Sequence, residues 1–188
     1  RMSKTAEELY FNKTLPTSLL SKKSSYVLGV DDASYDVMQT AIGQGKTQIT
    51  PLHLNMITQA IANGGQMMEP YVIDRVENYK GTLVKQFDKR VAGNIMTEEE
   101  AEFLTRLMTG VVEEGTASKL SGLSYTAAGK TGSAEYNGVK EDSHAWFTGF
   151  APAQNPEICV TIIVEGAGSG GDYAVPIAKR IFDAYFLK

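Results

Sequence analysis

The chain has 188 residues, of which 43% are hydrophobic and 21% charged, and its formal net charge is −4. These values are typical of one globular domain with a buried core, and the dispersed charges argue against a nucleic-acid-binding surface. The single cysteine, Cys159, excludes an internal disulfide, and no apolar run approaches the ~18 residues of a membrane-spanning helix. We expect Cys159 to be a small buried residue.

Two segments in the first third of the chain carry helical patterns. Residues 5–12 predict a short helix, and a polar loop follows to about Ser25. A longer helix begins after Thr50, which can cap it, with Pro51 in its first turn. Asn63 and the two glycines after it end this helix.

A hairpin and a second long helix follow. Residues 71–77 and 82–87 predict two strands joined by a turn. Thr97, with Glu100 three residues later, predicts the capping box of a helix that ends near Gly115. The apolar residues of this helix predict a broad buried face: Phe103, Leu104, Leu107, Met108, Val111 and Val112.

Three strands and a last helix complete the chain. One strand starts near Lys130, residues 144–152 form a second, and residues 158–166 form a third that is apolar on both faces and needs cover on both. The helix of residues 173–186 supplies one covering layer with two apolar rows: Ile177, Ile181, Tyr185 and Ala178, Phe182, Phe186. The pattern predicts an α+β fold, an antiparallel sheet flanked by helices.

The tripeptide Gly-Lys-Thr occurs twice, at 45–47 and 129–131. A phosphate-binding P-loop needs a glycine five residues before the Gly-Lys pair, where this chain has Thr40 and Ser124. Neither copy lies between a strand and a helix in the predicted elements. A P-loop nucleotide binder is therefore only a remote alternative.

The second copy continues as Lys130-Thr131-Gly132-Ser133, a signature of serine enzymes that recognise penicillin. On a strand that borders a cleft, Lys130 would place its ammonium in the cleft and the Thr131 side chain would face away. Gly132 would let a substrate backbone approach the strand. Ser133 would bind the substrate carboxylate through its hydroxyl, and its N–H would donate to an oxyanion.

Five spaced motifs surround this signature in a fixed order. They are TAIGQGKTQITPLHL, GGQMMEPYVI, MTGVVEEGTASKL, AGKTGSAEY and HAWFTGFAP, followed by a closing EGAGSGGDYAVPIAKRIF. Together they resemble the C-terminal half of the penicillin-binding protein transpeptidase domain, most of all the monofunctional, class B-like peptidoglycan D,D-transpeptidases. The resemblance implies that residues 1–188 are the C-terminal part of a single transpeptidase domain with an incomplete penicillin-binding/β-lactamase-like fold.

In the family that the chain resembles, a serine is acylated by the D-Ala-D-Ala end of a peptidoglycan stem peptide, the acyl group passes to an amine on a neighbouring stem, and β-lactams act as substrate mimics. Carried over by position, Lys130, Thr131, Gly132 and Ser133 bind the substrate, with Lys130 and the Ser133 N–H as the catalytic groups. The resemblance implies no cofactor and no nucleic-acid partner. It also implies a place on the extracytoplasmic face of the bacterial cell membrane, through an N-terminal anchor outside this chain.

The Ser-x-x-Lys nucleophile motif and the Ser-x-Asn motif of that family do not occur in the sequence. The nearest imitation is Thr116 with Lys119, at a place where the family has no nucleophile. We therefore expect a partner N-terminal half to supply the nucleophile, and this chain alone to be inactive. A serine β-lactamase and a non-enzymatic penicillin-sensing domain stay open as alternatives, because the same signature serves all three.

The remaining candidates have structural explanations. His144 is expected to be a hydrogen-bonding structural histidine, His53 a packing or surface residue, and Trp146 part of the core on a strand face. Two histidines without a carboxylate cluster predict no metal site. The glycines between Gly166 and Gly171 predict a mobile turn before the last helix.

Overall fold

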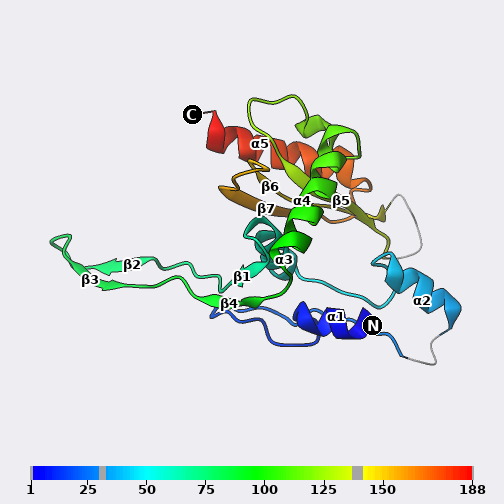
Figure 1. Ribbon diagram of the computed structural model, residues 1–188, viewed down its shortest axis with the longest axis horizontal. Coiled ribbons are helices and arrows are strands. Elements are labelled where there is room, and N and C mark those ends of the chain that lie inside the picture. Colours follow the sequence, from blue (N-terminus) through cyan, green and yellow to red (C-terminus); the bar gives the residue numbers. More distant parts are fainter. Residues whose placement is uncertain (1, 30–32, 137–141, 188) are drawn as a thin grey trace.

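A computed structural model describes residues 2–29, 33–136 and 142–187. Its main sheet contains β5 (Ala128–Ala134), β6 (His144–Ala151) and β7 (Ile158–Val164), which pair antiparallel in consecutive order. In Figure 1, α5 (Val175–Phe186) covers one face of this sheet and α3 (Pro51–Ala62) lies against the other. The predicted antiparallel sheet flanked by helices is confirmed.

Alternation along the central strand β6 explains why both faces are covered. Phe147 is fully buried and packs in the cluster that contains Phe182 of α5. Its neighbour Thr148 points to the opposite face, where its hydroxyl lies 2.7 Å from the hydroxyl of Thr58 on α3. Successive side chains of a strand point to opposite faces, so each face of β6 presents residues that suit its helix.

Two predicted helix starts are confirmed. The Thr50 hydroxyl accepts the N–H of His53 at the start of α3. Thr97 and Glu100 form the reciprocal capping box of α4 (Glu98–Glu113). Both caps link residues three positions apart, which is why the local sequence is sufficient to predict them.

The predicted apolar faces of two helices are only half correct. In α4, Met108 and Val112 are buried, whereas Phe103 and Leu107 are 52% and 54% exposed. In α5, the row with Ala178 and Phe182 is buried, whereas the outer row is exposed at 37–43%: Ile177, Ile181 and Tyr185. Within the part of the chain that the structure describes, one stripe of each helix has a packing partner and the neighbouring stripe faces solvent.

The N-terminal region differs from the prediction in two ways. The first helix, α1, spans Met2–Glu8 and starts three residues earlier than predicted. A further helix, α2 (Ser34–Ala41), was not predicted. Ala33, at the N-cap, makes no side-chain hydrogen bond, and Tyr35 and Met38 of the helix are exposed. The helix therefore has neither a capping side chain nor a buried apolar face, the two features by which a helix is usually predicted.

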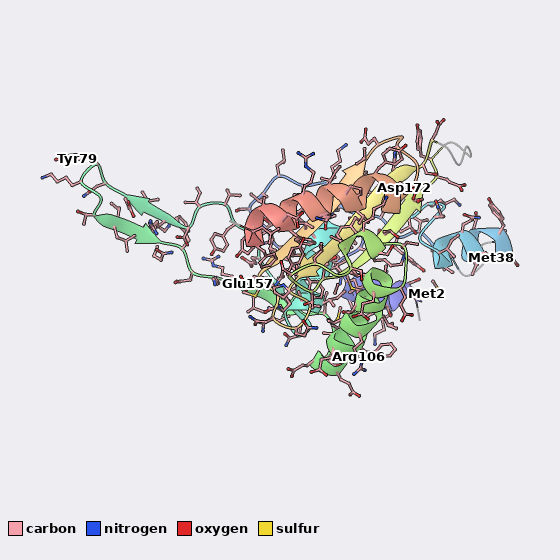
Figure 2. All side chains as sticks on the ribbon, turned by 90° about the horizontal axis from the view of Figure 1, so that it is seen from above. Met2, Met38, Tyr79, Arg106, Glu157 and Asp172 are labelled. Carbon is pink, nitrogen blue, oxygen red and sulfur yellow. The ribbon has the colours of Figure 1, made fainter. Side chains whose placement is uncertain are left out.

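A hairpin projects from the body of the molecule, as Figures 1 and 2 show. The strands β2 (Arg75–Glu77) and β3 (Leu83–Gln86) are shorter than predicted, and each of their residues is exposed to solvent; Tyr79 lies at the tip. A second pair, β1 (Gln66–Met68) with β4 (Val91–Asn94), joins the hairpin to α3 and was not predicted. The other regular elements of the described residues are a 3₁₀ turn, η1 (Ser118–Leu120), after α4, and a short π-helix, η3 (Gly170–Ala174), directly before α5.

No helix among the described residues is long and apolar enough to cross a membrane. The long helix α4 has 16 residues and begins with three glutamates.

His53 is fully buried in α3, and its Nε2 lies 2.7 Å from the carbonyl oxygen of Leu9. Because a carbonyl only accepts, Nε2 carries the hydrogen, and Nδ1 has no hydrogen-bond partner among the described residues. Burial lowers the pKa of this imidazole below its ordinary value of 6.5. The neutral ring therefore holds Leu9, directly after α1, against α3 through this hydrogen bond.

We expect the free energy of unfolding to fall as the pH drops below 6.5, with a slope of up to about 1.4 kcal/mol per pH unit. The unfolded chain binds a proton at His53 in this range, whereas the folded chain binds it only at lower pH. Thermal midpoints between pH 5 and 8 would measure the slope. In the complete protein, His53→Gln should flatten the curve; equal curves for the parent and His53→Gln would contradict the assignment.

Candidate functional site

The segment Lys130 to Ser133 lies in β5, at one edge of the main sheet. The Thr131 carbonyl accepts a hydrogen bond from Lys130 Nζ at 2.7 Å, and the Ser133 carbonyl accepts one from Gln44 Nε2 at 3.3 Å. Both carbonyls therefore point away from β6. In an antiparallel strand the N–H and C=O of a residue point to the same side, so the Ser133 N–H also faces the open edge.

The side chains of this segment alternate between the two faces of the sheet. Lys130 is paired in register with Thr148, whose hydroxyl contacts α3, so Lys130 lies on the α3 face. Thr131 is paired with Phe147, which packs under α5, and Ser133 shares that face. Side chains across a register pair point to the same face.

This geometry corrects one detail of the sequence analysis. We expected Lys130 and the Ser133 hydroxyl to point into one cleft while Thr131 faced away. The strand instead places the two hydroxyls together on one face, whereas the Lys130 side chain leaves from the opposite face and its ammonium bonds the Thr131 carbonyl at the open edge. A ligand can reach all three groups only by lying along the edge of β5.

Each of the two hydroxyls contacts a segment outside the sheet. Thr131 Oγ1 lies 2.5 Å from Thr116 Oγ1, in the turn after α4. Ser133 Oγ accepts the N–H of Gly170 at 3.3 Å. Neither contact was predicted, because Thr116 was considered only as an imitation nucleophile and Gly170 only as part of a turn.

Lys119 does not serve Thr116 as a base. Its Nζ lies 2.9 Å from the Gly171 carbonyl and 2.9 Å from Asp172 Oδ1. The hydrogen bond and the charge of Lys119 lower the pKa of the Asp172 carboxyl. The lysine therefore ties the turn after α4 to the glycine-rich segment before α5.

The glycine-rich segment lies directly on the candidate strand. A Cβ on Gly170 would come within 2.3 Å of the Trp146 carbonyl oxygen and 2.5 Å of the Gly132 carbonyl oxygen. A Cβ on Gly132 would meet only the Trp146 Cβ, at 3.4 Å. Gly170 is thus required for the close approach of this segment to the backbones of β5 and β6. The run of glycines in the sequence did not indicate which strands it would approach.

A hollow of about 730 Å³ adjoins the site on the α3 face. Trp146 and Ile163 line it from the sheet, and residues 43–45 line it from the segment before α3. Trp146 is half-buried and borders this hollow, so its assignment to the core was wrong. His144 accepts the Gly166 N–H at its Nδ1 and stacks on Tyr136, with 4.3 Å between the rings, in keeping with the structural role expected of it.

Cys159 is half-buried beside Asn55 of α3 rather than fully buried. Burial raises the pKa of its thiol to about 12, so this thiol is not a thiolate nucleophile at neutral pH. Among the described residues, no group of three or more histidine, cysteine, aspartate or glutamate side chains could hold a metal ion.

A family model, the penicillin binding protein transpeptidase domain, matches residues 1–183. The chain belongs to this transpeptidase family. The recognised family and its α+β fold are confirmed, and the nucleotide-binding alternative is not supported.

Individual relatives of this transpeptidase chain agree with the family match. It is 32% identical over 169 residues to the peptidoglycan D,D-transpeptidase MrdA of Haemophilus influenzae. The alignment covers 80% of this chain and 26% of MrdA. The D,D-transpeptidase domain of a peptidoglycan glycosyltransferase from Eggerthella lenta is 26% identical and superposes with a TM-score of 0.87, over 100% of this chain and 48% of that one.

A ceftriaxone acyl-enzyme complex of penicillin-binding protein A from M. tuberculosis is 28% identical, with a TM-score of 0.85, over 97% of this chain and 42% of that one. The chain therefore spans about a quarter of the length of the curated relative and less than half of the two solved chains.

Proposed function

We propose that this chain is the C-terminal part of a serine D,D-transpeptidase that cross-links peptidoglycan stem peptides through an acyl-enzyme and is acylated by β-lactams. The observation that carries the proposal is the Lys130–Ser133 segment on a strand edge that no other described strand covers. Support comes from relatives that are named D,D-transpeptidases, and from one solved as an acyl-enzyme.

The edge of β5 suits a peptide that ends in a carboxylate. The hydroxyls of Thr131 and Ser133 would donate to this carboxylate, and the Lys130 ammonium, held at the Thr131 carbonyl, would contribute positive charge at the same edge. The outward N–H of Ser133 would donate to the oxyanion that forms when a serine attacks the D-Ala-D-Ala peptide bond. Gly132 leaves room beside the strand for the substrate backbone.

The reaction also needs a nucleophile and its base, which we propose lie in an N-terminal half of the same protein. Attack by that serine would release D-alanine and leave the acyl-enzyme, and an amine of a neighbouring stem would then take the acyl group. We propose that the protein acts at the extracytoplasmic face of the bacterial membrane, where its substrate is assembled, through an anchor outside this chain. The chemistry requires no cofactor.

Labelled penicillin would test the proposal. We expect the complete protein to gain one stable adduct, on a serine N-terminal to this chain, and the isolated 188 residues to gain none. Ser133→Ala in the complete protein should slow acylation about 10- to 100-fold, the effect of a lost hydrogen bond to a charged group worth ~1.5–3 kcal/mol.

The matched control is Ser124→Ala, which removes an exposed hydroxyl outside the site and should acylate at the parental rate. Intact-mass analysis and peptide mapping locate the adduct. An adduct on a serine of this chain, or equal rates for Ser133→Ala and the parent, would contradict the assignment. Rapid release of hydrolysed penicillin would instead favour a β-lactamase.

A further inference from the structure

The two site hydroxyls share a feature that bears on how they could bind an anion. A hydroxyl has one hydrogen to donate and two lone pairs to accept. The Gly170 N–H can only donate, so the Ser133 oxygen accepts it at 3.3 Å and keeps its own hydrogen for another acceptor. The open edge of β5 is where such an acceptor would lie.

The contact between Thr116 and Thr131 can likewise leave the Thr131 hydroxyl hydrogen available for an anion. Their oxygens lie 2.5 Å apart, a separation that requires one hydrogen between them. If Thr131 donates its hydrogen to a carboxylate, Thr116 must supply the hydrogen of this pair. The resulting chain, from Thr116 to Thr131 to carboxylate, is mutually polarising and strengthens the outer hydrogen bond.

The turn that carries Thr116 also positions the segment that contains Gly170, whose N–H donates to the Ser133 hydroxyl. Lys119 binds the Gly171 carbonyl and the Asp172 carboxylate, each at 2.9 Å. A Cβ on Gly171 would come within 2.6 Å of the Thr116 carbonyl oxygen, so the two segments are in direct backbone contact. Residues 116–119 therefore align Thr131 directly and align Ser133 through Gly170.

We propose that Thr116 is a positioning residue that makes Thr131 a hydrogen-bond donor, and that Lys119 fixes the Gly170 N–H for Ser133. Together they would set the selectivity of this site for ligands with a free carboxylate. The inference rests on the proposed function, because it assumes that the carboxylate of a substrate or a β-lactam occupies the edge of β5.

The test compares the acylation of the complete protein by benzylpenicillin and by its methyl ester, which keeps the reactive ring and lacks the anionic carboxylate. Thr116→Val preserves the side-chain shape and removes the hydroxyl. We expect it to slow acylation by the acid about tenfold and to change the slower ester reaction by less than about twofold. Thr116→Ser, which restores the hydroxyl, should recover the parental rate with the acid.

Thr109→Val is the matched control, because the Thr109 hydroxyl donates to the Thr105 carbonyl within α4, outside residues 116–119. It should leave both rates unchanged. Lys119→Met is a second variant at a separate position and should show the same selective loss with the acid. Unchanged thermal midpoints would establish that the variants fold.

Three results would overturn the inference. Parental rates for Thr116→Val with the acid would show that its hydroxyl does not align Thr131. Equal losses with the acid and the ester would show a general structural effect instead of carboxylate selectivity. A parent protein that benzylpenicillin does not acylate would overturn the proposed function, and the inference with it.

Discussion

Replacing Gly170 by valine should lower acylation of the complete protein by labelled penicillin by about 100-fold or more and reduce its stability by about 2–4 kcal/mol. The new Cβ would lie 2.3 Å and 2.5 Å from the carbonyl oxygens of Trp146 and Gly132. Both obstacles are backbone atoms of paired strands, which cannot turn aside as a flexible side chain can. The glycine-rich segment would have to lift off the sheet and would remove the N–H that Ser133 accepts.

Two other glycines provide matched controls for this prediction. Gly110 lies inside α4 with open space around its missing Cβ, so Gly110→Ala should be neutral or stabilising by up to about 1 kcal/mol. A Cβ on Gly132 makes one contact at 3.4 Å, so Gly132→Ala should fold normally and is a control for stability alone, because Gly132 itself lies in the site. Thermal midpoints and adduct formation measure both effects. Parental acylation of Gly170→Val would show that this segment does not support the site.

Local signals explain which elements the sequence predicts correctly. The caps at Thr50 and Thr97 depend on residues three positions apart, so the pattern alone is sufficient. The pairing of β1 with β4 joins Gln66 to Asn94, far apart in the sequence, and neither short strand has a marked apolar alternation. The helix α2 has no side-chain cap, so the local pattern that predicts α3 and α4 is absent from it.

The candidate site divides in the same way. The Lys-Thr-Gly-Ser signature is a contiguous motif, so its position on a strand could be predicted, as could the opposite orientation of Lys130 and Thr131. The contacts of Thr116 and Gly170 span 15 and 37 residues of sequence, and only the folded chain brings them to β5. Trp146 was misassigned because alternation gives the face of a strand and not what lies opposite that face.

Apolar surface on the described residues leads to a further expected result, which concerns the 188 residues produced alone. β7 pairs with β6 on one side, and no strand within 2–29, 33–136 or 142–187 pairs with its other edge. The outer row of α5 exposes Ile177, Ile181 and Tyr185. We propose that the N-terminal half of the complete protein covers both surfaces.

The isolated chain should therefore associate with itself or stay incompletely folded, because an apolar strand edge pairs readily with other chains and large apolar patches favour association. Light scattering would report the association, and hydrogen exchange would show weak protection at residues 158–164, compared with strong protection in the complete protein. Ile177→Lys with Ile181→Lys should reduce association through α5 and leave the weak protection of β7 unchanged, since these substitutions do not supply a partner strand. A compact monomer of the unsubstituted chain, with strong protection across β7, would show that the sheet is stable without that partner.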